Sequence, residues 1–236
     1  MSLNRRSLLI AGSSVGLATL VYGCSDSNAE AEVSANVVTE IEPAADGEVA
    51  LYDGSQAEPI NGDAINNPPL PDRPMGGVDA TVTIVEYVSP TCPHCANFHM
   101  TALPQLKEEY IDTGRIRFIA RPFRRNVLDL AVFMVAEASG NQYNDVLSAY
   151  METQNVWAAS QNPRQAIFEV AEQFGFTQER FEEILTDEEL LAALEATREQ
   201  ALELGLQGTP TFFINGEKFE GNATYETLSA AIEERL

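Results

Sequence analysis

Two cysteines are the residues of this chain best placed to do chemistry. Cys92 and Cys95 lie three positions apart and follow Val82–Val88, a run of β-branched and aromatic residues that predicts a buried strand. Residues 96–110 predict a helix. Cys92 would therefore stand at a helix N-terminus, where free N–H groups and the helix dipole favour a thiolate, with Cys95 one turn further on. Strand, turn, Cys-x-x-Cys and helix together predict a redox-active pair.

The first 23 residues predict an export signal. Arg5 and Arg6 are followed by an apolar run over residues 8–21 that is too short and too rich in Gly and Ser for a stable membrane span. Val-Tyr-Gly before Cys24 resembles a bacterial lipobox, so Cys24 is a lipidation candidate; an ordinary secretory signal is the alternative. The arginine pair also resembles a twin-arginine signal, so either export route stays open. Export to the bacterial periplasm or cell envelope would place the dithiol where disulfides persist.

The charge of the chain restricts its partners. Acidic residues number 36 and basic residues 14 among 236, which gives a formal charge of −22. Nucleic acid and anionic lipid headgroups attract basic surfaces, so we expect neither as a partner, and the membrane contact that we expect is a lipid anchor at Cys24. Residues 24–76 are rich in Ala, Asp, Glu, Gly and Pro, with Arg73 their one basic residue, and predict an acidic disordered tether.

Residues 77–236 predict an α/β domain, in which a βαβ half and a ββα half flank a helical insertion over about residues 126–205. Gly and Asn residues mark several of the expected turns and caps. The further features that the sequence predicts are, in chain order, a helix end at Gly114, a strand over residues 115–121, an N-cap at Asn126, a capping box at Thr186 and Glu189, a hairpin over residues 211–220 that turns at Asn215-Gly216, and a terminal helix over residues 225–235.

Two motifs, far apart in the chain, resemble the DsbA-like branch of the thioredoxin superfamily. Cys92-Pro93-His94-Cys95 follows a strand, and Gly208-Thr209-Pro210-Thr211-Phe212 precedes the hairpin. Pro-His between the cysteines is the dipeptide typical of DsbA itself, and the resemblance covers residues 77–236. It implies a thioredoxin-like fold with a helical insertion. It also implies a cis peptide between Thr209 and Pro210 that faces the dithiol and the substrate.

The resemblance also implies roles for the residues around the dithiol. Cys92 would be the exposed attacking sulfur and Cys95 its buried partner. Glu86 interrupts an apolar strand, where a buried carboxylate is costly without a task or a partner. The resemblance makes Glu86 a proton acceptor that serves the buried cysteine through water; an exposed sheet face is the alternative. His94 would add charge or a hydrogen-bond donor near Cys92, or face solvent.

Other polar residues are expected to have structural roles. His99 follows Cys92 by two helical turns, and we interpret it as a surface or packing histidine. Trp157, the sole tryptophan, is expected to pack within the helical insertion. The basic residues Arg115, Arg117, Arg121, Arg124 and Arg125 are expected to be solvated or paired with acids, with a docking patch for acidic partners as the alternative.

The sequence as a whole predicts a protein dithiol–disulfide oxidoreductase without a cofactor, which introduces disulfides into exported proteins through a Cys92–Cys95 disulfide. Its partners would be thiols of exported proteins and a membrane redox protein of DsbB or DsbD type, and we expect a monomer. An isomerase or reductase would share this site, and a non-catalytic, lipid-anchored binding protein is a further alternative. A zinc site at Cys92, Cys95 and His99 lacks a second ligand pair at the usual spacing, so no metal is expected.

Overall fold

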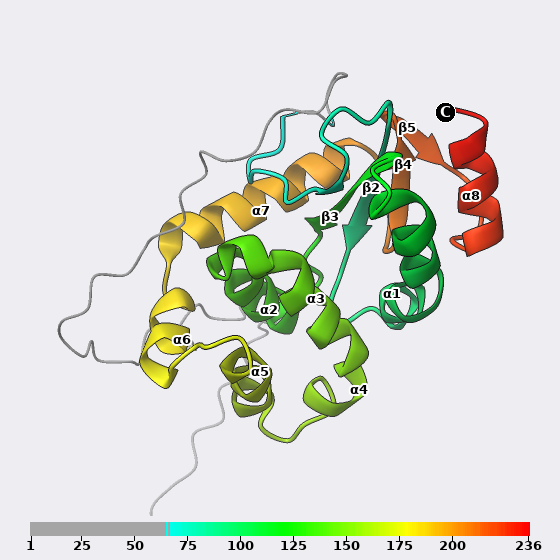
Figure 1. Cartoon of the computed structure of the whole chain (residues 1–236). Coiled ribbons are helices and arrows are strands. Elements are labelled where there is room, and N and C mark those ends of the chain that lie inside the picture. Colours follow the sequence, from blue (N-terminus) through cyan, green and yellow to red (C-terminus); the bar gives the residue numbers. More distant parts are fainter. Residues whose placement is uncertain (1–64, 66) are drawn as a thin grey trace, which may run out of the picture. The chain divides into compact units, whose positions relative to one another are not determined.

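The computed structural model describes residue 65 and residues 67–236 (Figure 1). The predicted signal peptide, the lipidation candidate Cys24 and the predicted tether up to residue 64 lie outside the described residues. Of the helices in the described part, none has the length and apolar character that a membrane crossing requires.

A five-stranded mixed sheet, ordered β1-β3-β2-β4-β5, forms the centre of the domain. Its middle strand β2 (Val82–Val88) pairs in parallel with β3 (Ile116–Pro122) and antiparallel with β4 (Thr211–Ile214). Strands β1 (Met75–Gly76) and β5 (Glu217–Phe219) are the two edges. This topology confirms the predicted βαβ unit, the hairpin and the thioredoxin-like α/β fold.

Helices cover the sheet and extend past one of its ends (Figure 1). Helices α1 (Pro93–Leu106) and α8 (Tyr225–Glu233) contact each other, while α7 (Glu188–Glu203) contacts β3. Besides α7, the predicted helical insertion contains α2 (Val127–Ala138), the 3-10 turn η5 (Gly140–Gln142), α3 (Tyr143–Glu152), α4 (Gln154–Trp157), α5 (Pro163–Glu172) and α6 (Gln178–Ile184).

Strand β2 is buried along its whole length because both faces of the sheet are covered. Ile84 and Val88 belong to the larger apolar core, which includes residues of α1 and α8. Val85 and Tyr87 belong to a second core on the opposite face, together with residues of α7. Since side chains alternate along a strand, Glu86 points to the same face as Ile84 and Val88, toward α1.

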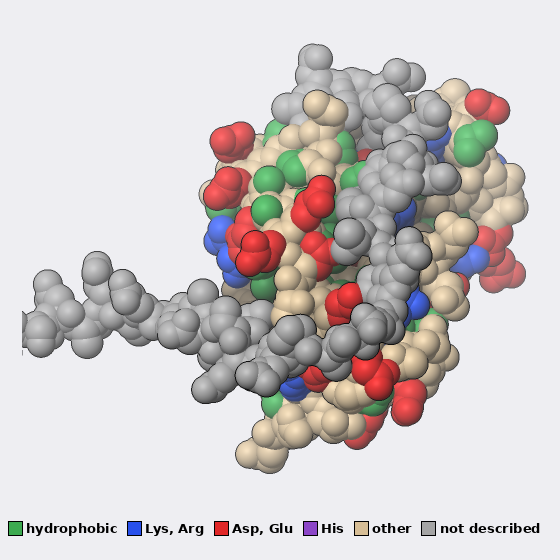
Figure 2. All heavy atoms as spheres, turned by 90° about the vertical axis from the view of Figure 1, so that its left-hand side faces the viewer, with side chains coloured by type: hydrophobic (Ala, Val, Ile, Leu, Met, Phe, Trp, Pro, Cys, Tyr) green, Lys and Arg blue, Asp and Glu red, His purple; other side chains and the backbone are tan. Residues whose placement is uncertain are grey.

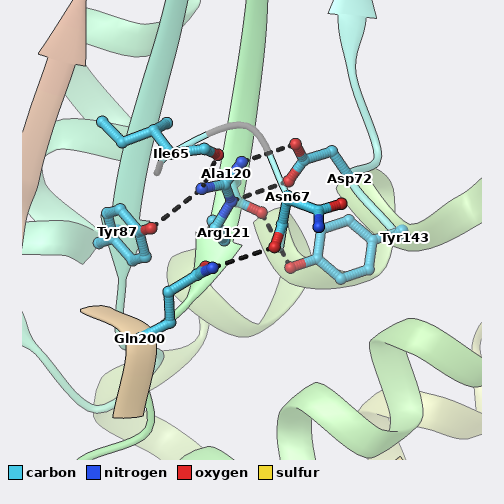
Figure 3. A network of polar contacts seen from close by, with 8 residues as sticks. All are labelled: Ile65, Asn67, Asp72, Tyr87, Ala120, Arg121, Tyr143 and Gln200. Atoms are coloured by element: carbon cyan, nitrogen blue, oxygen red, sulfur yellow. Dashed lines mark hydrogen bonds and ion pairs between the residues drawn. The ribbon is translucent and has the colours of Figure 1, made fainter. Parts of the chain in front are cut away.

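The residues just before the predicted domain start belong to the folded domain. Leu70 is 2% exposed, and Arg121 of β3 donates two hydrogen bonds to the carboxylate of Asp72, at 2.9 and 2.7 Å (Figure 3). Arg121 also donates to the hydroxyl of Tyr87 and to the carbonyl of Ile65, each at 2.9 Å. The prediction of a disordered tether as far as residue 76 is therefore wrong for this stretch. Buried polar contacts hold it, and these leave no apolar pattern in the sequence.

The other arginines of this region largely follow the expectation. Arg115 pairs with Glu233 at 2.9 Å, and Arg124 pairs with Glu195. Arg121 is also paired with an acid, Asp72, but its side chain is buried and stabilises the segment before β1. Acidic side chains are spread over the face of the molecule that Figure 2 presents, as the net charge requires.

The helices begin and end at, or within a few residues of, the positions that the sequence predicts. Asn126 caps α2, because its side chain accepts from the N–H groups of Leu128 and Asp129. Helix α7 is capped by Asp187 and not by Thr186; the Thr186 hydroxyl donates to the preceding turn. Helix α1 includes Pro104 and continues into a π-helix, η4 (Lys107–Ile111), before a left-handed glycine at position 114 ends it.

Candidate active site

The turn that carries Cys92 is fixed by side chains from the helical insertion. Asp129 of α2 is fully buried and accepts hydrogen bonds from the Thr91 N–H at 2.7 Å and the Ser89 hydroxyl at 2.8 Å. Gln154 of α4 donates to the carbonyl groups of Pro90 at 2.6 Å and Cys92 at 3.0 Å. The insertion therefore sets the position of the redox turn.

Cys92 is the N-cap of α1, with Pro93 at the first helical position. Its thiol donates to the carbonyl oxygen of Thr209, 3.2 Å away. The pKa of Cys92 is lowered to about 4, chiefly because the Cys95 thiol can donate to its sulfur; burial opposes this, and the Thr209 side chain and the backbone N–H groups of Cys95 and His94 lower the pKa further. Cys92 is thus a thiolate at neutral pH in the dithiol form.

One aspect of Cys92 differs from the expectation. The sequence predicts an exposed sulfur, whereas Cys92 is only 3% exposed, because the Thr209 loop lies against it. For His94 the sequence leaves two alternatives, a charge or donor near Cys92 or a position facing solvent. His94 is an exposed residue, and its backbone N–H is the group that helps to lower the pKa of Cys92.

Cys95 has the opposite character. It is fully buried, and burial raises its pKa far above the ordinary value; the neighbouring Cys92 sulfur and the charge of Glu86 raise it further. Both cysteines are free thiols. One sulfur of the pair therefore carries a stabilised negative charge, while the other keeps its proton.

A groove opens beside the dithiol. The Thr209–Pro210 peptide bond is cis, and both residues line this groove. Helix α1 contributes His94, Asn97 and Phe98 to its wall. The chain around β4, β5 and the loop toward α8 supplies the remaining lining, which is Thr211, Phe212, Lys218, Phe219, Glu220, Gly221, Asn222 and Ala223. The groove thus joins the redox turn to the proline loop across the end of the sheet.

Glu86 and His99 form a buried pair on the α1 side of the sheet. The His99 Nε2 and Glu86 Oε2 atoms are 2.9 Å apart, and the residues are 8% and 0% exposed. His99 is thus a packed residue, but one bonded to a charged group, which sequence reasoning missed. Glu86 raises the pKa of Cys95 electrostatically, and its side chain points toward α1, the helix that carries Cys95. The alternative of an exposed position for Glu86 is wrong.

Sequence reasoning also missed Asp129 and Gln154, the residues that hold the redox turn. An acid in the first turn of a helix has an ordinary explanation in the helix dipole, so Asp129 carries no local signal. Trp157 follows the expectation: it is 1% exposed, and its indole N–H donates to the Tyr150 carbonyl within the insertion. Among the described residues, no group of three or more His, Cys, Asp and Glu side chains is placed to hold a metal ion.

Comparison with known proteins agrees with this geometry. A family model named Thioredoxin matches residues 70–234. The crystal structure of Wolbachia pipientis alpha-DsbA1 superposes with a TM-score of 0.65 at 25% identity, covering 70% of this chain and 90% of that one. The chain belongs to the DsbA-like branch of the thioredoxin superfamily. The start of the family match at residue 70 also agrees with the folded segment before β1.

Sequence relatives of this DsbA-like chain carry related names. A Rickettsia conorii protein named as a protein-disulfide oxidoreductase is 34% identical over 168 residues, which cover 70% of this chain and 60% of the relative. A Bacillus anthracis protein named "Probable disulfide bond formation protein D" is 28% identical over 172 residues, covering 69% and 77%. The chain spans somewhat less than two thirds of the length of the Rickettsia relatives.

Proposed function

We propose that this protein is a thiol:disulfide oxidoreductase and that it works as a dithiol oxidase, introducing disulfides into exported proteins. The observation that carries the proposal is the contrast between the two thiols. The pKa of Cys92 is lowered to about 4, whereas burial raises that of Cys95. A stabilised Cys92 thiolate favours the dithiol form over the disulfide. Electrons therefore flow readily from a substrate into the pair, as an oxidase requires.

The groove and the redox turn support a protein or peptide substrate. Thr209 and Pro210 precede β4, lie beside Cys92 and line the groove, where an extended substrate backbone can bind. A substrate thiolate would attack Cys92 to form a mixed disulfide, and a second substrate thiol would resolve it. The export signal expected over residues 1–23 favours exported proteins as substrates and a membrane redox protein as the agent that restores the disulfide.

The test is the redox potential of the Cys92–Cys95 pair, measured against glutathione by quantifying free thiols. An oxidase should have a potential nearer DsbA's, about −120 mV, than thioredoxin's, about −270 mV. A value close to that of thioredoxin would overturn the oxidase direction. The assay should be paired with oxidation of a reduced peptide and with refolding of a scrambled substrate, because activity on the second substrate alone would indicate an isomerase.

A further inference from the structure

The Glu86–His99 pair holds two buried polar atoms that need an explanation. Glu86 Oε1 and His99 Nδ1 have no hydrogen-bond partner among the described residues, although the opposite atoms of the pair, Oε2 and Nε2, are 2.9 Å apart. Buried polar atoms are nearly always paired, and exceptions often mark a site with a task. These two atoms belong to one hydrogen-bonded pair, and Glu86 acts electrostatically on the Cys95 thiol.

We propose that His99 is a positioning residue that connects Glu86 to solvent and so forms the outer end of a proton route to Cys95. The inference rests on the proposed function. The order of burial fits such a route, because Cys95 and Glu86 are fully buried while the His99 side chain is 4% exposed. His99 Nε2 holds the carboxylate through Oε2, which leaves Oε1 free to exchange a proton with the sulfur. The Nδ1 atom is itself buried, so the outward exchange requires a water molecule to reach it.

The reaction needs this proton. When a substrate thiolate attacks Cys92, the Cys92–Cys95 bond breaks and its electron pair passes to Cys95. Burial strongly disfavours a Cys95 thiolate, so the sulfur must take up a proton. A second substrate thiol then releases Cys92 as a thiolate. Two substrate thiols thus lose two electrons and two protons; one proton is balanced by the one delivered to Cys95, and the other is released to solvent.

Within residues 67–236, the surroundings of Glu86 offer no better proton carrier than His99. The titratable groups that face it are Cys95 and His99 of α1 and Tyr143 of α3, and its neighbours on β3 and β4 are Ala120 and Phe212. The Tyr143 hydroxyl donates to the Ala120 carbonyl at 3.0 Å, and burial raises its pKa well above the ordinary value. Histidine, in contrast, can gain and lose a proton near neutral pH.

The first test compares wild type with His99→Gln, which keeps an N–H donor for Glu86 but cannot relay a proton. Oxidised protein is mixed with dithiothreitol in a stopped-flow instrument, and the appearance of the Cys92 thiolate is followed by ultraviolet absorbance at several pH values in H2O and D2O. We expect a rate at least about tenfold lower at pH 7, with an altered pH profile and solvent isotope effect. A wild-type profile in folded His99→Gln would overturn the route.

The second test needs no change at His99. Nitrogen-15 NMR of the wild-type protein at pH 7 should show different ring-nitrogen shifts for His99 in the dithiol and disulfide forms, because Cys95 gains its proton through this pair. Glu86→Gln should remove that difference, and the exposed His94, the one other histidine, serves as the reference signal. Identical His99 shifts in both wild-type forms would overturn the route. A wild-type protein that exchanges no thiols would instead overturn the proposed function.

Discussion

The thiol of Cys92 lies 3.2 Å from the carbonyl oxygen of Thr209, although 117 positions separate the two residues in the chain. The contact brings the redox turn against the proline loop, so one loop both covers the attacking sulfur and borders the groove. While Cys92 is a thiol, the buried Thr209 hydroxyl has no hydrogen-bond partner in the described part of the chain. It is among the groups that lower the pKa of Cys92, so it gains a partner when the sulfur ionises.

Thr209→Val should therefore raise the pKa of Cys92, because valine has the same shape and lacks the hydroxyl. Since the thiolate is what stabilises the dithiol form, the potential of the pair should fall in parallel. Thiolate absorbance near 240 nm across a pH series would give the midpoint, which we expect near 4 in the wild type. Thr209→Ser is the matched control, as it keeps the hydroxyl and should stay closer to the wild type. Equal midpoints for the valine and serine variants would contradict this role.

The order of attack can be tested on the cysteines. Cys92→Ser should abolish exchange, because it removes the sulfur that is a thiolate at neutral pH. Cys95→Ser should instead accumulate mixed disulfides with a disulfide-bonded peptide, because its Cys92 thiolate attacks the peptide disulfide, one peptide sulfur leaves as a thiol, and the buried sulfur that could resolve the adduct internally is gone. Mass spectrometry of the trapped adducts would identify the bridged residue. The assigned order of attack would be wrong if the Cys92→Ser protein formed adducts on Cys95 and the Cys95→Ser protein formed none on Cys92.

Local sequence patterns were sufficient for the fold and for the centre of the site. The β-branched strand before Cys92, the Asn215-Gly216 turn and the Asn126 cap each act on neighbouring residues, so their sequence determines their structure. The two motifs at Cys92–Cys95 and Thr209–Pro210 pointed to the family by resemblance. The structure then placed Cys92 and Thr209 in contact.

The rest depends on contacts that no local pattern records. Asp72 and Arg121 are 49 positions apart, and the segment that carries Asp72 has the composition of a disordered chain. Glu86 and His99 meet because Glu86 points from β2 toward α1 and His99 lies on the side of α1 that faces β2. Both orientations must be known to predict the contact. Gln154 reaches the redox turn from a four-residue helix whose place is fixed only by packing of the insertion.

Arg121→Met should destabilise the domain strongly, because it leaves the Asp72 carboxylate without its buried partner. Breaking a buried ion pair from one side costs on the order of 3–5 kcal/mol. Chemical denaturation followed by circular dichroism would measure the change. Arg115→Met is the matched control: the Arg115–Glu233 pair is exposed, so its loss should cost about 1 kcal/mol or less. Equal losses for the two variants would mean that the buried pair does not anchor the segment before β1.

The double substitution Arg121→Met with Asp72→Leu separates the ion pair from packing. Removing both charges leaves neither group unpaired, so the double variant should regain much of the stability lost in Arg121→Met. Limited proteolysis would report on the segment itself, since release of residues 65–76 exposes them to cleavage. If the two residues act independently, the losses of unfolding free energy from Arg121→Met and Asp72→Leu should simply add, and the double variant would be less stable than Arg121→Met alone.

Glu137→Gln should change how stability depends on pH. Glu137 is 2% exposed, and burial raises its pKa from 4.5 to about 7, against the opposing effect of Arg73, whose Nε lies 3.3 Å away. Because the folded value exceeds the unfolded one, the stabilisation is complete below about pH 4.5 and is lost as pH rises through about 7. The amide of the variant keeps the shape of the protonated acid. It should therefore match the wild type near pH 4.5 and exceed its unfolding free energy at pH 8, by at most about 3 kcal/mol. Urea titrations at the two pH values measure the difference, with a substitution at an exposed glutamate, Glu199→Gln, as control. Equal effects of Glu137→Gln at both pH values would contradict a buried carboxyl that titrates near neutral pH.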